Sequence, residues 1–368
     1  MKKLPKPFIV HLSLTGKCNF RCTICPSARQ DRKYDRREMG PSLLKRVLDT
    51  VIPHATTLIL GGNSLGEVTT HEGFSLFLEP SFNRDSGLEL RLTTNGYRIG
   101  EFAESLAEKF SFVGISFDGA TKATYEGIRR YPFEKTVKNI EEVIDARQRL
   151  GGRLRVGLGM TCLYKNIQEL PDLVGMAVNM GVDAVTGSYF IPNFPSERYQ
   201  CLYYHQRYAN DIISAAFRRR GIDFRMPRYV LPETELPEEE KTPVYKKCNL
   251  PFTMVNISET GIVTPCCANP TIMGDLNRQG IWEIWHGRRY AAFRGDVGGN
   301  LYCRLCHTPV FGERASAGYL LDPSYQIKTI GSELPPLMAL RAYIFQKIVG
   351  TGAGRRLLGA AKTVLRRK

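Results

Sequence analysis

Three cysteines near the N-terminus have the spacing of ligands for one metal cluster. They are Cys18, Cys22 and Cys25, and they follow the apolar run 8–14. A C-x3-C-x2-C spacing on one loop can direct three thiolates at a single centre. A cubane iron–sulfur cluster normally takes four cysteines, so this loop would leave one iron free to bind another molecule.

Two other kinds of site compete with a cluster at this loop. A zinc ion would need a fourth ligand, which His11 on the preceding run could supply. A disulfide would need an oxidising compartment. The N-terminal apolar run is short, is interrupted by His11 and lacks a small-residue cleavage site, so it makes a poor signal peptide. An iron–sulfur cluster is therefore our first interpretation.

A second group of cysteines begins after residue 247. Its pattern is C-x12-G-x4-C followed by C-x2-C, and its candidate ligands are Cys248, Cys266, Cys303 and Cys306. Four thiolates could complete a second cubane cluster or a zinc ribbon. Cys267 is a register alternative to Cys266, but the spacing from the glycine favours Cys266.

The first cysteine loop resembles that of the radical S-adenosylmethionine (radical SAM) superfamily, although Ile24 stands where an aromatic residue is usual. The resemblance implies that SAM binds the open iron and that the reduced cluster cleaves it to methionine and a 5′-deoxyadenosyl radical. A flavodoxin or ferredoxin would supply the electron, and the radical would abstract a hydrogen atom from the substrate.

The second group resembles the SPASM and shorter twitch extensions of the same superfamily. The resemblance implies an auxiliary [4Fe–4S] cluster in addition to the SAM-binding [4Fe–4S] cluster. The later cysteines of a full SPASM domain are absent, so we expect a single auxiliary cluster of the twitch type. With four ligands it would have no open iron, which favours a role in accepting or passing an electron.

Short motifs after the expected strands resemble the SAM-contacting segments of the superfamily. The Gly66-Glu67 pair resembles the motif that meets the SAM amino group, although Val68 stands where proline is usual; an ordinary glycine-rich turn is the alternative. Arg129 would bind the SAM carboxylate, and Asn166 would either contact SAM or be structural. The residues that the resemblance assigns to SAM are Gly66, Glu67, Asn95, Ser116, Asp118, Arg129 and Asn166.

The elements that must position these residues alternate between short β-like runs and longer helical patterns. After the first run, strands are expected at 57–60, 88–92, 112–116, 154–158 and 184–186, with helices at 41–51, 100–109, 133–150 and 167–180. This alternation favours an α/β fold, and six units over about 220 residues indicate a partial (β/α)6 TIM-like barrel. Reactive groups in such barrels lie on loops at the C-terminal ends of strands, where the first cysteine loop falls.

Composition and charge divide the chain into four expected segments: the barrel at 1–225, a Pro/Glu-rich linker at 226–247, the auxiliary domain at 248–330 and a basic helical tail at 331–368. No apolar stretch approaches the roughly 18 residues of a spanning helix. The net charge is +15, and the chain from residue 334 onward has eight basic residues and no acidic one. Amphipathic helices there could contact an anionic membrane surface, and a docked or disordered tail is the alternative. We predict no specific nucleic-acid binding.

These features predict a cytoplasmic radical SAM enzyme, peripheral to the inner face of the membrane if the tail binds lipid. The auxiliary cluster would take an electron from the substrate radical. The net reaction would then be an oxidation or a bond formation on a peptide, sugar-like or lipid-linked substrate. The alternative is a non-catalytic iron–sulfur or zinc protein that serves as a scaffold or electron relay. No residue is assigned as a catalytic acid or base.

Overall fold

The computed structural model describes most of the first 297 residues. The described residues are 8–28, 36–62, 65–79, 81–82, 87–190, 192, 195–226, 228, 248–266, 269–297 and 303. Almost all of the expected linker, the whole basic tail, Cys267 and Cys306 lie outside them, so the expectations for these parts stay predictions. Among the described residues, no helix is both long and apolar enough to cross a membrane.

Ten strands and nine α-helices are described. The strands are β1 (Ile9–Leu12), β2 (Thr57–Leu60), β3 (Glu89–Thr94), β4 (Phe112–Ser116), β5 (Arg155–Cys162), β6 (Ala184–Tyr189), β7 (Asp223–Arg225), β8 (Met254–Ile257), β9 (Ile262–Thr264) and β10 (Gly274–Asp275). The helices are α1 (Pro41–Thr50), α2 (Ala103–Lys109), α3 (Lys122–Arg129), α4 (Phe133–Leu150), α5 (Leu170–Asn179), α6 (Gln206–Phe217), α7 (Leu250–Thr253), α8 (Ile281–Trp285) and α9 (Arg288–Gly295).

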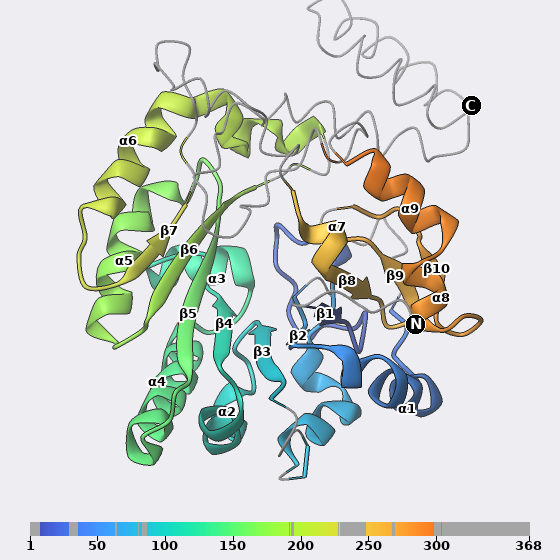
Figure 1. Cartoon of the computed structure of the whole chain (residues 1–368). Coiled ribbons are helices and arrows are strands. Elements are labelled where there is room, and N and C mark those ends of the chain that lie inside the picture. Colours follow the sequence, from blue (N-terminus) through green and yellow to red (C-terminus); the bar gives the residue numbers. More distant parts are fainter. Residues whose placement is uncertain are drawn as a thin grey trace, which may run out of the picture.

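The described strands form one sheet in the order β10-β9-β8-β1-β2-β3-β4-β5-β6-β7. Strands β1 to β7 are parallel, and the sheet curves with helices such as α2, α4 and α5 on its outside (Figure 1). The expected α/β fold with a partial TIM-like barrel is confirmed, and β1 to β6 are the six expected strands. The short strand β7 continues the sheet beyond them.

The auxiliary region is joined to the barrel through its backbone. Strand β8 pairs in parallel with β1, with Val10 beside Val255 and His11 beside Asn256. Strands β9 and β10 then continue antiparallel. The cysteine-rich region therefore extends the barrel sheet at its β1 edge, an arrangement that no local pattern in the sequence indicates.

The two faces of β1 differ in character because successive side chains of a strand point to opposite sides. Val10 and Leu12 are buried in the main hydrophobic core, which also contains Leu44 of α1 and Ile140 of α4. His11 therefore faces the other side of the sheet, which is the inside of the barrel. Burying these apolar side chains between strands and helices stabilises the barrel and fixes which residues face inward.

Candidate cluster and SAM site

The first cysteine loop directly follows β1, at the C-terminal end of the sheet. None of its three cysteines forms a disulfide with another described residue, and the amide of Cys25 donates to the carbonyl of Cys22 at 3.1 Å. The backbone is held by two distant segments, because Thr23 N donates to Ile128 O and Glu67 N donates to Lys17 O, each at 2.8 Å. The loop is thus positioned by the end of α3 and by the turn after β2.

The three thiols lie close enough together to influence one another. Burial raises the pKa of Cys18 to about 11, and Glu67, Cys22 and Cys25 add to the rise. Burial also raises the pKa of Cys22, against the opposing effect of Arg129. Thiolates are the form that binds a metal, so loading this loop must release protons.

A single zinc ion is not supported by the described residues. Among them, no three His, Cys, Asp or Glu side chains gather around one point that could hold one metal ion. Among the described residues, His11 is not gathered with the three cysteines. A cubane cluster spaces its ligands more widely than one ion does, and three cysteine donors on one loop fit it.

Gly66 lets the turn after β2 approach the cysteine loop. A Cβ atom on Gly66 would lie 2.1 Å from Thr15 O and 2.6 Å from Lys17 O, so no other residue fits without moving the backbone. The next residue, Glu67, is 3% exposed. The structure thus gives Gly66 a close-packing role and holds Glu67 beside the loop.

The Glu67 carboxylate joins the turn after β2 to the end of β3. Its Oε1 accepts hydrogen bonds from the hydroxyls of Thr69 and Thr94, both at 2.7 Å, and its Oε2 accepts one from Asn95 N at 2.7 Å. The Asn95 side chain then reaches the cysteine loop, donating to Asn19 Oδ1 at 2.9 Å and lying 3.8 Å from Cys18 Sγ. Glu67 and Asn95 are therefore brought together with Cys18.

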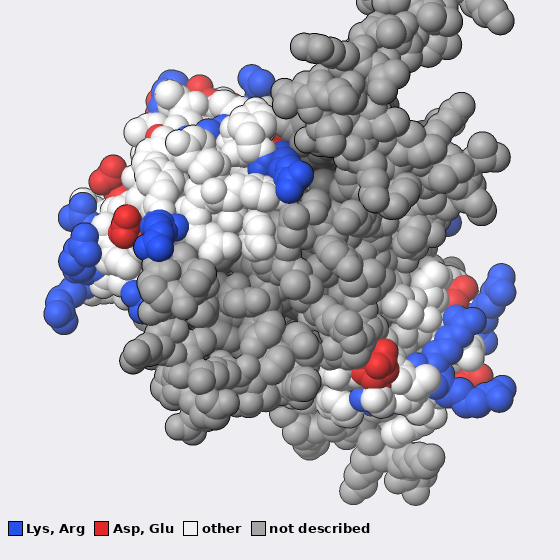
Figure 2. Space-filling model, turned by 90° about the horizontal axis from the view of Figure 1, so that it is seen from above, with Lys and Arg blue, Asp and Glu red and all other residues white. Residues whose placement is uncertain are grey.

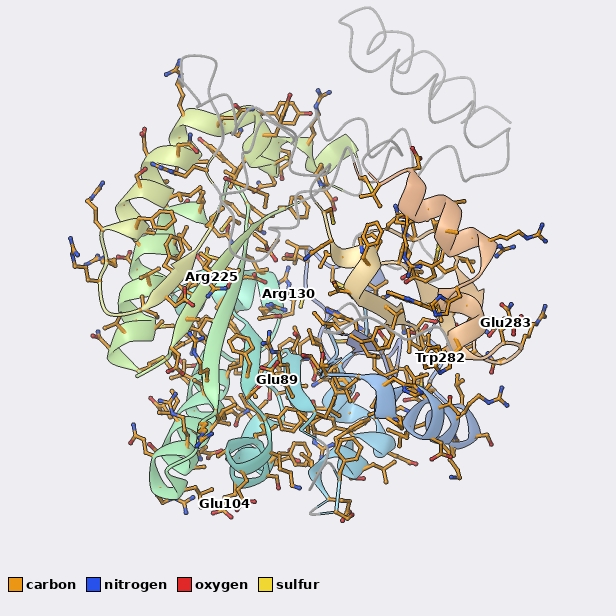
Figure 3. The ribbon with its side chains drawn as sticks, viewed as in Figure 1. Glu89, Glu104, Arg130, Arg225, Trp282 and Glu283 are labelled. Atoms are coloured by element: carbon orange, nitrogen blue, oxygen red, sulfur yellow. The ribbon has the colours of Figure 1, made fainter. Side chains whose placement is uncertain are left out.

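Asp118 and Arg129 form a second buried group on the other side of the loop. Arg129 Nε lies 2.7 Å from Asp118 Oδ2, and the Asp118 side chain is completely buried. Arg129 Nη1 also lies 3.7 Å from Cys22 Sγ. Figure 3 shows the neighbouring Arg130 near the middle of the molecule, beside α3. The pair thus places a guanidinium next to a candidate cluster ligand.

Ser116 and Asn166 occupy different positions. Ser116 ends β4, beside Gly159 of β5. The Asn166 amide donates to Asp118 O and Thr161 O, both at 3.0 Å, and its Oδ1 accepts from Leu163 N at 2.7 Å. These bonds tie the ends of β4 and β5 together, and a contact of Asn166 with SAM stays a prediction.

Two described cysteines of the second group share one small apolar cluster. Cys266 packs there with Leu250 and Met254, and Cys248 and Ile9 of β1 pack against it. Cys303 packs at the edge of the main core. Cys306 lies outside the described residues, so the complete ligand set stays a prediction.

Three polar side-chain atoms inside the barrel have no hydrogen-bond partner among the described residues, and sequence reasoning did not assign them to this role. They are both ring nitrogens of His11 and the Oδ1 atom of Asn256, whose amide nitrogen donates to the hydroxyl of Thr264 at 3.0 Å. The two residues are neighbours in the β1–β8 register. Burial and then the charge of Arg91 lower the pKa of His11 to about 4, so its imidazole is neutral near pH 7. Their position where the barrel meets the auxiliary region could not be predicted from the sequence, because it depends on the pairing of β8 with β1.

Replacing His11 tests whether these nitrogens serve the fold. A His11→Leu substitution should raise the free energy of unfolding of the metal-free protein at pH 7 by about 1–2 kcal/mol, because it removes buried polar atoms that have no partner. Since the folded-state pKa of about 4 lies below the ordinary histidine pKa of 6.5, the stability associated with neutral His11 is lost as the pH falls between these values. Urea unfolding at pH 7 and pH 5 should show a weaker pH dependence in the variant. A loss of stability at pH 7 would contradict the prediction.

The fold and the cysteine loop define a class of protein, and two family models identify it. The Radical SAM superfamily model matches residues 12–177, and the SPASM model, an iron–sulfur cluster-binding domain, matches residues 248–307. The chain therefore belongs to the radical SAM superfamily and carries a SPASM domain. The radical SAM domain binds a [4Fe–4S] cluster and SAM, and the SPASM domain binds auxiliary iron–sulfur clusters.

Curated relatives match over most of the chain at low identity. The tungsten-containing aldehyde ferredoxin oxidoreductase cofactor-modifying protein of Pyrococcus furiosus is 23% identical over 81% of this chain and 86% of its own length. The AdoMet-dependent heme synthase of Methanosarcina barkeri is 24% identical over 76% of this chain and 82% of its own length.

Solved structures support the fold. Streptococcus suis SuiB bound to S-adenosylmethionine has a TM-score of 0.56 at 17% identity, covering 78% of this chain and 68% of SuiB. The structure of anSMEcpe with bound AdoMet has a TM-score of 0.58 at 14% identity, covering 92% and 99%. At these identities the likeness concerns the fold.

Proposed function

We propose that this chain is a catalytic radical SAM enzyme whose SAM-binding cluster is held by Cys18, Cys22 and Cys25. The observation that carries the proposal is that the cysteine loop meets both the Glu67–Asn95 group and the Asp118–Arg129 pair at one end of the sheet. When bound, the cluster supplies the electron that cleaves SAM and so generates the radical that removes a substrate hydrogen atom.

The residues around the loop would orient SAM. Glu67 offers a carboxylate for the SAM ammonium, and its bonds from Thr94 and Asn95 fix its direction. Arg129 uses Nε for Asp118 and Nη1 for Cys22, which leaves Nη2 for the SAM carboxylate. Ser116 ends β4 and Asp118 follows it, and their short hydroxyl and carboxylate side chains suit the ribose hydroxyls of SAM.

The auxiliary cluster, with ligands Cys248, Cys266, Cys303 and Cys306, would accept an electron from the substrate radical. The pairing of β8 with β1 supports this role. Strand β1 precedes the first cysteine loop and β8 lies between Cys248 and Cys266, so the segments that carry the two groups of cysteines are neighbours. In the cell, a flavodoxin or ferredoxin would reduce the SAM-binding cluster.

We favour a small-molecule substrate over a ribosomal peptide. The names of several sequence relatives refer to small molecules: a cofactor-modifying protein, a heme synthase and the GTP 3′,8-cyclase of Helicobacter pylori, which is 23% identical over 70% of this chain. The unpartnered atoms of His11 and Asn256 offer hydrogen bonds to a neutral polar group of such a substrate inside the barrel.

Anaerobic reconstitution followed by addition of dithionite and SAM tests the proposal. We expect 5′-deoxyadenosine and methionine by mass spectrometry, together with about eight iron and eight sulfide per chain if both sites hold [4Fe–4S] clusters. A protein with a filled first site that forms no 5′-deoxyadenosine would refute the catalytic role. That result, or two zinc ions per chain, would favour the non-catalytic scaffold or relay considered from the sequence.

A further inference from the structure

Arg294 on α9 is a partly exposed cation that lies against aromatic rings of the auxiliary region. Its guanidinium carbon lies 3.9 Å from the ring centre of Trp285 and 4.3 Å from that of Tyr290. Its Nε donates to Pro251 O at 2.9 Å, and its Nη1 donates to Trp285 O at 2.8 Å. The side chain is thus fixed in one place by α7, α8 and α9.

This cation has no acidic partner within the part of the chain that the structure describes. None of the ion pairs found there includes Arg294. Its Nη2 atom is buried and has no hydrogen-bond partner among the described residues, while the residue as a whole is partly exposed, and burial lowers the pKa of the guanidinium. Partly withdrawing a positive charge from water without a counter-ion carries a cost, which the aromatic rings offset in part.

The segments that fix Arg294 adjoin two cysteines of the second group, Cys248 and Cys266, in sequence or in space. Pro251 follows Cys248 by three residues. Tyr290, which is fully buried, donates its hydroxyl to Met254 O at 3.3 Å. Met254 in turn packs with Cys266. The positive charge of Arg294, which lacks an acidic partner among the described residues, and the candidate ligands Cys248 and Cys266 therefore lie in one small region.

We propose that Arg294 is the counter-ion of the auxiliary cluster and raises its reduction potential. A [4Fe–4S] cluster with four cysteinate ligands is anionic in both redox states, and it gains one more negative charge when it accepts an electron. A fixed cation favours the more negative state, so it promotes electron uptake. The inference deepens the proposed role of the Cys248, Cys266, Cys303 and Cys306 site, and it does not depend on SAM cleavage.

A redox titration followed by electron paramagnetic resonance tests this role in the full-length holoenzyme. The auxiliary signal is assigned by comparison with a Cys18→Ala/Cys22→Ala/Cys25→Ala variant, which retains only that cluster. Arg294→Gln should reduce the equilibrium constant for one-electron reduction about tenfold, which corresponds to a potential about 59 mV lower. Arg294→Lys keeps the charge and should retain most of the original potential.

Two exposed arginines on the same helix provide matched controls. Arg288 and Arg289 lie on the first turn of α9 and are exposed. Figure 2 shows Lys and Arg side chains that project into solvent at the edges of the molecule. Arg288→Gln and Arg289→Gln should leave the potential unchanged, since solvent screens their charges.

The outcomes separate a counter-ion from a purely structural contact. An unchanged potential in an iron-replete Arg294→Gln variant overturns the proposal. If Arg294→Gln fails to hold the auxiliary cluster, then retention of cluster and potential in Arg294→Lys supports it. Loss of the auxiliary iron in both variants overturns it in favour of a structural contact. Because 5′-deoxyadenosine forms at the other cluster, its measurement in the same samples reports independently on the proposed activity.

Discussion

A Cys22→Ala variant is expected to lose SAM cleavage almost completely. Cys22 is buried, and its sulfur lies 3.7 Å from Arg129 Nη1. Replacing a residue that only supports a metal ligand lowers metal affinity or activity about 10–100-fold. Loss of a ligand itself should therefore lower 5′-deoxyadenosine formation more than about 100-fold. Iron should fall from about eight to about four per chain if the auxiliary cluster stays loaded.

The buried Cys162 provides the control for this prediction. It lies in the main core, and its thiol donates to Met160 O at 3.7 Å. Cys162→Ala should keep the full iron content and form 5′-deoxyadenosine at a normal rate. Wild-type iron content together with normal SAM cleavage in Cys22→Ala would show that this cysteine is not a cluster ligand.

Breaking the Asp118–Arg129 pair should have the second large effect. An Asp118→Asn substitution leaves the Arg129 guanidinium buried without its counter-ion. Removing one partner of a buried ion pair costs about 3–5 kcal/mol of the free energy of unfolding. Urea unfolding of the metal-free protein measures this loss. Asp118→Asn/Arg129→Met, which removes both charges, should recover a large part of it.

An exposed ion pair serves as the reference for that measurement. Lys122 Nζ lies 2.7 Å from Glu134 Oε1, and both side chains are largely exposed. Glu134→Gln should not change the unfolding curve measurably, since solvent screens such pairs. If Asp118→Asn behaved like Glu134→Gln, the Asp118–Arg129 pair would not be a stabilising contact of the folded chain.

Local patterns predicted the barrel well. The expected strands at 57–60 and 112–116 match β2 and β4, and the expected helix at 133–150 matches α4. These segments bury a regular set of apolar side chains, and such a pattern is readable in the sequence. Helix α3 was not predicted, because it is only eight residues long and buries only Tyr125 and Ile128.

The candidate site also has parts that the sequence predicts and contacts that it does not. The three cysteines could be recognised because they lie within one short stretch, and Glu67 because it resembles a local motif. That the Glu67 carboxylate binds Asn95 N and that Arg129 pairs with Asp118 are contacts between loops of different strands. The unpartnered atoms of His11 and Asn256 depend on a pairing between segments about 245 residues apart, which no local pattern encodes.

The position of β8 has a consequence for how the chain can be divided and made. β1 has β2 on one side and β8 on the other, so the barrel obtains a complete first strand only after the residues beyond 253 have left the ribosome. A fragment that stops before them would present the backbone amides and carbonyls of β1 as an open edge. Such edges recruit strands from other molecules, and a shortened version of this chain should therefore tend to associate with itself.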